Sequence, residues 1–236
     1  MKDGVRIQSD LALKRVEALY RYDGHGYLTS INERNGRAAP RFFLMRTVDN
    51  VVCRFRADLP RDLASRLEAL CNKEPVGDLS GKLPVHYAKY LELLSSHAPV
   101  DRGWAGPAYM STQHLPPSAP PIAIGDDNAH LLRDGFEDWM PDVPHRRPFM
   151  AMIESDHAVS ICASVRISDA VHCAGVETRA DHRQRGHAVN AVAGWARAVI
   201  SLGATPFYST SWDNVASQGV ARRLRLALVG VDFHLT

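Results

Sequence analysis

The spacing of apolar residues in the second half of the chain predicts strands and helices in turn. Two apolar runs, 149–154 and 159–167, flank the turn residues Ser155-Asp156-His157 and predict a β-hairpin. The β-branched and small residues of 171–178 predict the next strand. After a polar loop, apolar residues recur three and four positions apart up to Leu202, at Val189, Val192, Ala193, Ala196, Val199 and Ile200. This is the spacing of one helix face, so a helix follows the strand.

The flanking segments extend this order. Upstream, the Asp pair at 126–127 is placed to cap a helix that Pro141 ends. Downstream, the pattern predicts a strand beginning at Pro206, a helix that Asn214 opens and a last strand at 226–234. The second half therefore reads helix, three strands, helix, strand, helix, strand, which predicts a fold of the α/β (α+β) class.

The first half has its own set of predicted elements. Its spacing predicts a helix at 11–20, a Gly-rich loop at 23–36, a hairpin formed by 42–47 and 51–55, and two helices at 60–72 and 84–96. Four of the seven residues from Leu115 to Pro121 are proline, which removes backbone donors and keeps the chain extended. We therefore predict an N-terminal α/β region of unknown role at 1–115 and a second domain at 120–236.

Composition favours a soluble enzyme. The 236 residues are 45% hydrophobic and 23% charged, which is enough to bury a substantial core. A net charge of +2 with dispersed basic residues gives no nucleic-acid surface. No segment approaches the roughly 20 apolar residues of a membrane helix, and the first residues lack a signal-peptide core, so we expect a cytoplasmic protein without membrane partners. The four cysteines form no Cys-x-x-Cys pair, so no metal is expected.

The loop between the strand at 171–178 and the following helix is the strongest functional signal. A helix start presents backbone N–H groups without intrahelical partners and a partial positive charge, which together attract a phosphate. Gly186 lets a backbone approach a ligand closely. Three arginines accompany a single acid in this loop: Arg179, Arg183 and Arg185 beside Asp181. On these residues alone, an anion site and an ordinary turn with solvated arginines are both open.

The run Arg183-x-x-Gly186-x-Ala188 resembles the acetyl-CoA pyrophosphate motif of the GNAT family of N-acetyltransferases, Arg/Gln-x-x-Gly-x-Gly/Ala. The resemblance extends to Asn214 and Ser217, which fit the family's Asn-x-x-Ala/Ser at the start of the helix after the next strand. The closest subgroup is a bacterial one with a Trp shortly before this Asn, here Trp212, and an Ala-Arg/Lys-x-Leu run after it, here 221–224. The similarity covers about half of the chain, from roughly 120 to the end.

This resemblance implies a GNAT fold, with a mixed, mostly antiparallel central sheet flanked by helices. It also implies transfer of an acetyl group from acetyl-CoA to a primary amine by direct attack. Backbone groups of Val176 and Thr178 would hold the pantetheine arm, with Asn214 and Ser217 on its other side. The pyrophosphate would rest on the loop and helix start, at Arg183, Gln184, Arg185, Gly186, His187 and Ala188. The implied partners are acetyl-CoA and an unidentified amine acceptor, and a homodimer is left open.

Two residues are candidates for the catalytic base. His172 begins the strand where some family members carry a catalytic Glu, and Glu177 lies closer to the loop. Strand alternation places His172 on the face of Val176 and Thr178 and Glu177 on the other, unless a bulge near Gly175 resets it. A structural role is open for each. Glu177 is favoured, because a carboxylate in a small and apolar strand is costly unless it is used.

The chain departs from the family at the general acid. Many members carry a Tyr one turn into the helix after the Asn, where this sequence has Ala221, and Tyr208 on the preceding strand faces either the core or a cleft. Two alternatives therefore stay open: a non-catalytic acyl-CoA sensor or scaffold, and a protein that binds a different phosphate ligand. One of the family's two closing strands is also missing. Either the domain is trimmed or the N-terminal region supplies that edge, which is the hypothesis we adopt.

Overall fold

The computed structural model describes residues 2–111 and 118–236, with side chains from Asp10 onward. The chain forms two compact units. Unit 1 contains the chain up to Tyr109 together with Ser209–Val215 and Leu228–Thr236, and unit 2 contains Met110–Tyr208 and Ala216–Ala227. The proline-rich boundary predicted from the sequence lies partly outside the described residues, at 115–117. Independent folding of 1–115 and 120–236 stays a prediction.

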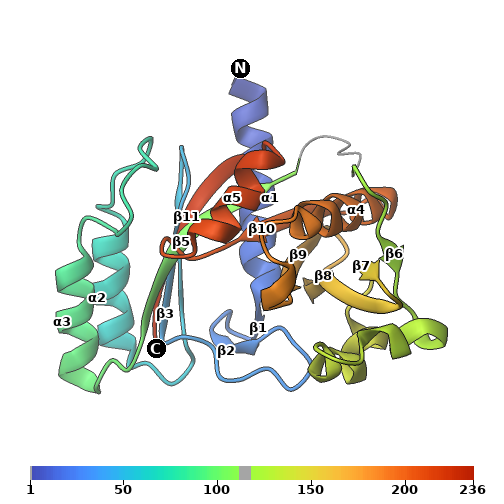
Figure 1. Ribbon diagram of the computed structural model, residues 1–236. Helices are drawn as coiled ribbons and strands as arrows, with labels where there is room; N and C mark the ends of the chain where they lie inside the picture. Colours follow the sequence, from blue (N-terminus) through green and yellow to red (C-terminus); the bar gives the residue numbers. More distant parts are fainter. Residues whose placement is uncertain (1, 112–117) are drawn as a thin grey trace. The chain divides into compact units, whose positions relative to one another are not determined.

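Unit 1 combines the first half of the chain with its last strand. Its elements are α1 (Lys2–Leu19), β1 (Tyr20–Tyr22), β2 (Leu28–Ile31), β3 (Phe42–Arg46), β4 (Val51–Phe55), α2 (Arg61–Cys71), α3 (Tyr87–His97), β5 (Gly103–Met110) and β11 (Ala227–Leu235) (Figure 1). β1 and β2 form a separate antiparallel pair, and the other strands lie in the order β4-β3-β11-β5. β3 pairs antiparallel with both β4 and β11, so the last strand of the chain has an N-terminal strand as its partner.

The predicted hairpin and the three predicted helices of the first half are confirmed. The loop predicted at 23–36 is wrong in part, because β2 forms within it. The Asp23 carboxylate accepts hydrogen bonds from the N–H groups of His25 and Tyr27, both at 2.9 Å. This side-chain turn reverses the chain and brings β2 back onto β1.

β3 is buried on both faces. Phe42 and Leu44 belong to a core shared with α2 and α3, which lie side by side (Figure 1). Phe43 points to the opposite face, where its ring meets Tyr20 with centroids 5.3 Å apart. Because successive side chains of a strand point to opposite faces, unit 1 has apolar packing on each side of β3.

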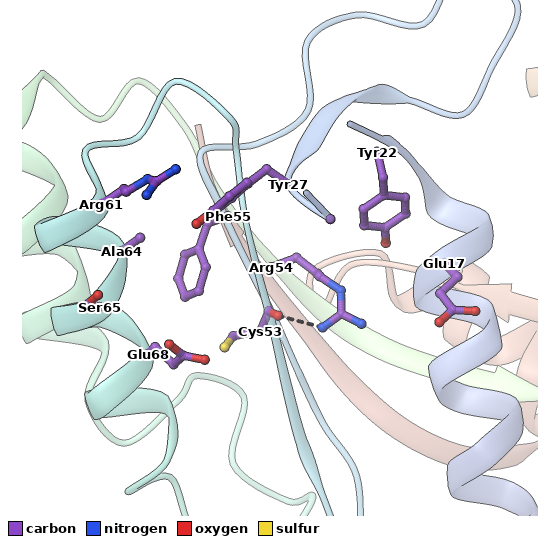
Figure 2. Close-up of a pocket in the computed structure, with 11 residues that line it drawn as sticks. Glu17, Tyr22, Tyr27, Cys53, Arg54, Phe55, Arg61, Ala64, Ser65 and Glu68 are labelled. Carbon is purple, nitrogen blue, oxygen red and sulfur yellow. Dashed lines mark hydrogen bonds between the residues drawn. The ribbon is translucent and has the colours of Figure 1, made fainter. Parts of the chain in front are cut away.

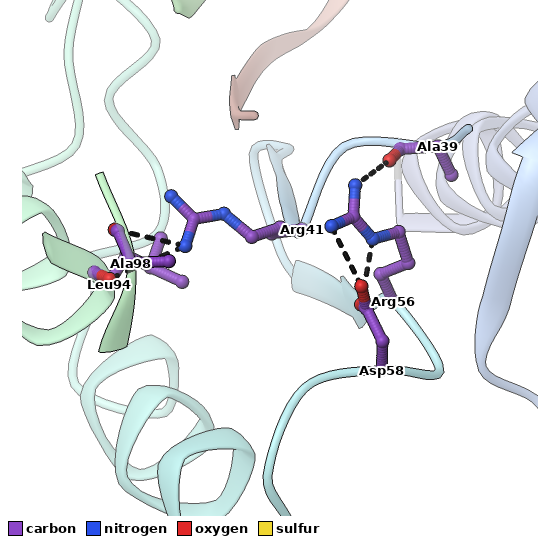
Figure 3. Close-up of polar contacts among 6 residues, drawn as sticks. All are labelled: Ala39, Arg41, Arg56, Asp58, Leu94 and Ala98. Carbon is purple, nitrogen blue, oxygen red and sulfur yellow. Dashed lines mark hydrogen bonds and ion pairs between the residues drawn. The ribbon is translucent and has the colours of Figure 1, made fainter. Parts of the chain in front are cut away.

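Two arginines hold backbone segments of unit 1 in place (Figure 3). Arg41 is buried and donates a hydrogen bond to the carbonyl of Ala98, just after α3, at 3.1 Å. Arg56 pairs with Asp58 at 2.7 Å and donates to the carbonyl of Ala39 at 3.0 Å. The last carbonyls of a helix lack intrahelical donors, so Arg41 supplies a donor to a carbonyl at the end of α3.

Unit 2 carries the succession of strands and helices predicted for the second half. Its elements are β6 (Ile122–Ala123), the 3₁₀ segments η1 (Asp126–Leu132) and η2 (Glu137–His145), β7 (Phe149–Glu154), β8 (His157–Ile167), β9 (Val171–Thr178), the 3₁₀ turn η3 (Ala180–His182), α4 (His187–Ser201), β10 (Thr205–Ser209) and α5 (Val215–Arg223). The strands lie in the order β10-β9-β8-β7-β6, with β10 parallel to β9 and the others antiparallel. The predicted α/β fold class, with a mixed and mostly antiparallel sheet flanked by helices, is confirmed.

The helix predicted after the Asp pair at 126–127 is wrong, because η1 and η2 form in its place. Asp134 and Gly135 between them adopt positive φ angles of 64° and 142°, which an α-helix does not allow. Pro141 and Pro144 lie inside η2, where proline removes helix donors. The apolar residues of both segments still pack on β7 and β8, and α4 covers the other face of these strands (Figure 1). No helix in the described ranges is long and apolar enough to cross a bilayer.

Candidate functional site

β9 and β10 begin as a parallel pair and then separate. The paired residues are Val171–Cys173 and Thr205–Phe207, although β9 continues to Thr178 and β10 to Ser209. Among the described strands, the rest of β9 pairs only with β8. One backbone edge of β9 is therefore without a strand partner where the strand approaches the loop.

The backbone groups of Val176 and Thr178 face this edge. The N–H of Arg179 donates to the carbonyl of Val159 on β8 at 3.0 Å, which identifies these two residues as a hydrogen-bonded pair. Hydrogen-bonded and non-hydrogen-bonded pairs alternate along an antiparallel ladder. Glu177 therefore turns its backbone N–H and C=O groups toward β8. Its neighbours Val176 and Thr178 turn theirs away from β8, toward the edge that has no strand partner.

The loop after β9 ends at a helix start that no side chain caps. Gly186 is the N-cap residue of α4 and has φ 87° and ψ −2°, in the left-handed region. No atom lies within 4 Å of the position that a Cβ would take, so the backbone conformation rather than space favours glycine here. The N–H groups of the first helical turn lack intrahelical acceptors, and the helix dipole adds a partial positive charge. This helix start can bind an anion.

Cationic side chains surround the helix start. Arg183 donates from Nε to the carbonyl of Thr178 at 3.4 Å, and Arg179 pairs with Asp181 at 3.4 Å. The side chains of Arg183, Gln184 and Arg185 are exposed. The predicted pyrophosphate residues from Arg183 to Ala188 thus lie together, in unit 2, directly after the unpaired edge of β9. In the described part of the chain, no group of three or more His, Cys, Asp or Glu side chains is placed to hold a metal ion.

The structure places His172 in the closed part of β9. Its pairing partner on β10 is Pro206, before the strands separate, and Thr178 is six residue steps, roughly 20 Å of strand, farther along β9. The ring is 7% exposed, and Nδ1 lies 2.8 Å from the hydroxyl of Ser164, which accepts a hydrogen bond from the indole of Trp195 on α4. Burial lowers the pKa of His172, so the ring is held neutral in the core.

Glu177 lies on the opposite face and is exposed. Its Oε2 accepts a hydrogen bond from the indole Nε1 of Trp139 on η2 at 2.8 Å. A Cβ at Gly175 would overlap Val165 and lie 3.0 Å from the Trp139 ring, so this glycine lets the indole cross the strand and reach the carboxylate. The register shift lies in β8, between Ser164 and Arg166, and the alternation predicted for β9 therefore holds.

The remaining predicted residues are divided between the units. Ser217, on α5, hydrogen-bonds through its hydroxyl to Tyr208, whose side chain is buried. Ala221, at the position of the family's general acid, is also buried. Asn214 belongs to unit 1, where its N–H donates to the carbonyl of Ser211 at 3.2 Å. The predicted pyrophosphate residues and the two residues of β9 predicted to bind pantetheine therefore share one unit, and Asn214 belongs to the other.

A cavity of about 610 Å³ lies in unit 1, and none of the residues predicted for the site lines it (Figure 2). Side chains of α1, β1, β4 and α2 line it, among them Glu17, Tyr22, Arg54, Arg61 and Glu68. Sequence reasoning missed this cavity, because its lining comes from four separate elements and forms no motif. It missed the contact of Trp139 with Glu177 for the same reason.

Comparison with known proteins gives a likeness of fold. No protein-family model matches the chain, and no curated protein matches its sequence. A Drosophila protein of known structure has a TM-score of 0.50 and 14% identity, over 97% of this chain and 87% of that chain. A GCN5-related N-acetyltransferase-like protein from Streptococcus suis has a TM-score of 0.48 and 14% identity, over 84% and 85%. A GNAT-family protein from Novosphingobium aromaticivorans has a TM-score of 0.46 and 13% identity, over 58% of this chain and 65% of that chain. This chain therefore spans less than two thirds of the length of that protein.

Proposed function

We propose that the chain is an N-acetyltransferase that moves an acetyl group from acetyl-CoA to a primary amine. The observation that carries this proposal is the separation of β10 from β9 next to the uncapped start of α4. An extended pantetheine arm can pair with the unpaired edge of β9 as an added strand would, and a pyrophosphate can accept from the N–H groups of the helix start. The Arg183-x-x-Gly186-x-Ala188 motif supports the same ligand.

In this proposal the cofactor-binding residues divide by the part of acetyl-CoA that they bind. Backbone groups of Val176 and Thr178 bind the pantetheine arm, with Asn214 and Ser217 on its other side. The pyrophosphate is bound by Arg183, Gln184, Arg185, Gly186, His187 and Ala188. Exposed guanidinium groups and a helix N-terminus together favour a doubly charged group over a neutral one.

Glu177 is the proposed base, in preference to His172. The Trp139 indole fixes Oε2, and Oε1 can take a proton from the acceptor ammonium, directly or through a water. The neutral amine then attacks the thioester carbonyl carbon, a C–N bond forms, the attacking nitrogen releases its second proton to water, the C–S bond breaks and CoA leaves as the thiolate. Water protonates the thiolate, because α5 carries no Tyr. His172 is buried beside paired backbone and is less suited to meet an acceptor.

Calorimetry with acetyl-CoA, CoA and ADP tests the binding step. We expect acetyl-CoA and CoA to bind more tightly than ADP, because ADP lacks the arm that β9 would hold. Equal affinity for all three would favour a generic phosphate site and contradict the proposal.

A thiol-release assay over a panel of amines tests catalysis and identifies the acceptor class. On a proven acceptor, Glu177→Gln is expected to reduce kcat by about 10²-fold or more, the usual scale of general base catalysis. His172→Ala serves as the second arm. If both variants turn over like the wild type, neither residue is the base.

A non-catalytic acyl-CoA sensor or scaffold is the second candidate function. The buried Ala221 at the place of the family's Tyr is the observation that favours it. Tight binding of acetyl-CoA without thiol release on any amine would support this alternative.

A further inference from the structure

A single carboxylate lies between two histidines at the ends of the phosphate loop. Glu154 is the last residue of β7, and its Oε1 is 3.2 Å from Nε2 of His187 while its Oε2 is 3.4 Å from Nε2 of His182. His182 ends η3, and His187 is the first residue of α4. The two contacts therefore bracket the segment 183–186, which carries four of the six predicted pyrophosphate residues, and His187 itself is a fifth.

Both histidines are well packed, whereas the segment between them is not. The side chains of His182 and His187 are 17% and 11% exposed, and their ring centroids lie 6.2 Å apart. Nδ1 of His182 lies 2.9 Å from a carboxylate oxygen of Asp181, and this contact lowers the pKa of Asp181. The residues from Arg183 to Arg185 are exposed. A packed histidine ring thus lies at each end of an exposed loop.

The bracketed segment has a backbone that needs support. Gln184 has a φ of 64° and Gly186 a φ of 87°. Residues with a side chain, such as Gln184, rarely adopt a positive φ. Ordering such a segment during binding costs conformational entropy. A loop that is already ordered binds its ligand more tightly, because it loses less conformational entropy when the ligand binds.

We propose that Glu154 is a positioning residue for the pyrophosphate, acting through His182 and His187 rather than by touching the ligand. A carboxylate would repel a phosphate, so a direct role is unfavourable. By holding both ends of the loop, Glu154 sets the N–H groups of the helix start and the arginines before the ligand arrives. This inference rests on the proposed function, since that function places an anion on the loop.

The test compares Glu154→Ala and Glu154→Gln with the wild-type full chain, by calorimetry with ADP and with acetyl-CoA. We expect Glu154→Ala to weaken both ligands by the same factor, on the order of tenfold, the scale at which outer-shell partners of binding side chains act. ADP contains the pyrophosphate but not the pantetheine arm, so an equal loss places the effect at the phosphates. Glu154→Gln keeps the size and an acceptor oxygen and should recover part of the affinity. With saturating acetyl-CoA, kcat should be unchanged.

Asp156→Asn is the matched control. Asp156 lies in the same hairpin, two residues from Glu154, with φ 63°, a conformation that Asn tolerates well. The substitution removes the same charge from the hairpin and leaves both histidine contacts intact, so ligand affinity should not change.

Three outcomes would overturn the inference. Wild-type affinity of Glu154→Ala for both ligands would show that the loop does not depend on this carboxylate. A loss that Asp156→Asn reproduces would assign the effect to general charge. A wild type that binds neither ligand would refute the proposed function itself, and this outcome is distinct from the first two, in which the wild type binds normally.

Discussion

The two units use charged side chains in opposite ways. Unit 1 buries a charged pair: Arg15 on α1 meets Asp232 on β11 at 2.7 Å, with the two side chains 1% and 3% exposed. The buried Glu74 carboxylate accepts from the N–H groups of Val85 and His86, both at 2.9 Å, just before α3. These charges are matched within the unit, and their removal would leave a buried partner without its counter-charge.

Unit 2 has exposed arginine side chains in the loop before α4. Arg183 and Arg185 are exposed beside a helix start that no side chain caps. Exposed charges contribute little to stability, but they remain available to a ligand. The comparison teaches that the same residue type can be buried in an ion pair in one unit and left exposed, where the proposed function uses it for recognition, in the other. In the described part of the chain, the two cases differ in whether the arginine side chain is buried and in whether a carboxylate is paired with it.

The largest effect is expected at the buried pair of unit 1. Arg15→Met should lower the free energy of unfolding by about 3–5 kcal/mol, because it leaves the Asp232 carboxylate buried without its cation. Urea unfolding of the variant and the wild type measures this. The double variant with Asp232→Leu is the control and should recover much of the loss. A change below about 1 kcal/mol for Arg15→Met would show that the pair is not buried in solution.

A smaller effect, on ligand affinity and not on folding stability, is expected at the loop of unit 2. Arg183→Gln should weaken acetyl-CoA binding by about tenfold or more, the value of one charge-assisted hydrogen bond. The free energy of unfolding should stay within about 0.5 kcal/mol of the wild type, as for other surface substitutions. Calorimetry and urea unfolding check the two parts.

Arg197→Gln, farther along α4, is the matched control for this loop variant and should leave binding unchanged. If Arg183→Gln instead destabilised the fold and left binding intact, the contrast between the units would be wrong.

The smallest effect is expected at His172, a buried titratable group of unit 2. Burial lowers its pKa in the folded state, so the unfolded chain binds its proton more readily and stability falls as the pH drops through about 6.5. His172→Asn removes the titratable ring. The side-chain oxygen of the Asn can still accept a hydrogen bond from the Ser164 hydroxyl. Between pH 7.5 and 5.5 the wild type should lose more stability than the variant, because only the wild type carries the ring whose pKa burial lowers. Unfolding at both pH values measures it, with the exposed His97→Asn as control. An identical pH dependence would place His172 in solvent.

Local patterns predicted much of the fold. The hairpin of β7 and β8, strand β9 and helix α4 all lie where the spacing of apolar residues placed them, because the periods of strands and helices are properties of adjacent residues. The patterns failed where special backbone angles intervene, as at Asp134 between η1 and η2. They also missed β5, since Gly103, Gly106 and Pro107 conceal a strand that neighbouring backbone stabilises.

By itself, the sequence determined the order of elements after 149 and the chemistry of the loop around Gly186, because periodicity, backbone permissiveness and cationic side chains are local properties. Only the tertiary structure decided where β10 leaves β9, that Trp139 reaches Glu177, and that Glu154 lies between two histidines. The physical reason is that these features arise from contacts between residues far apart in the chain, whose pairing no local pattern specifies.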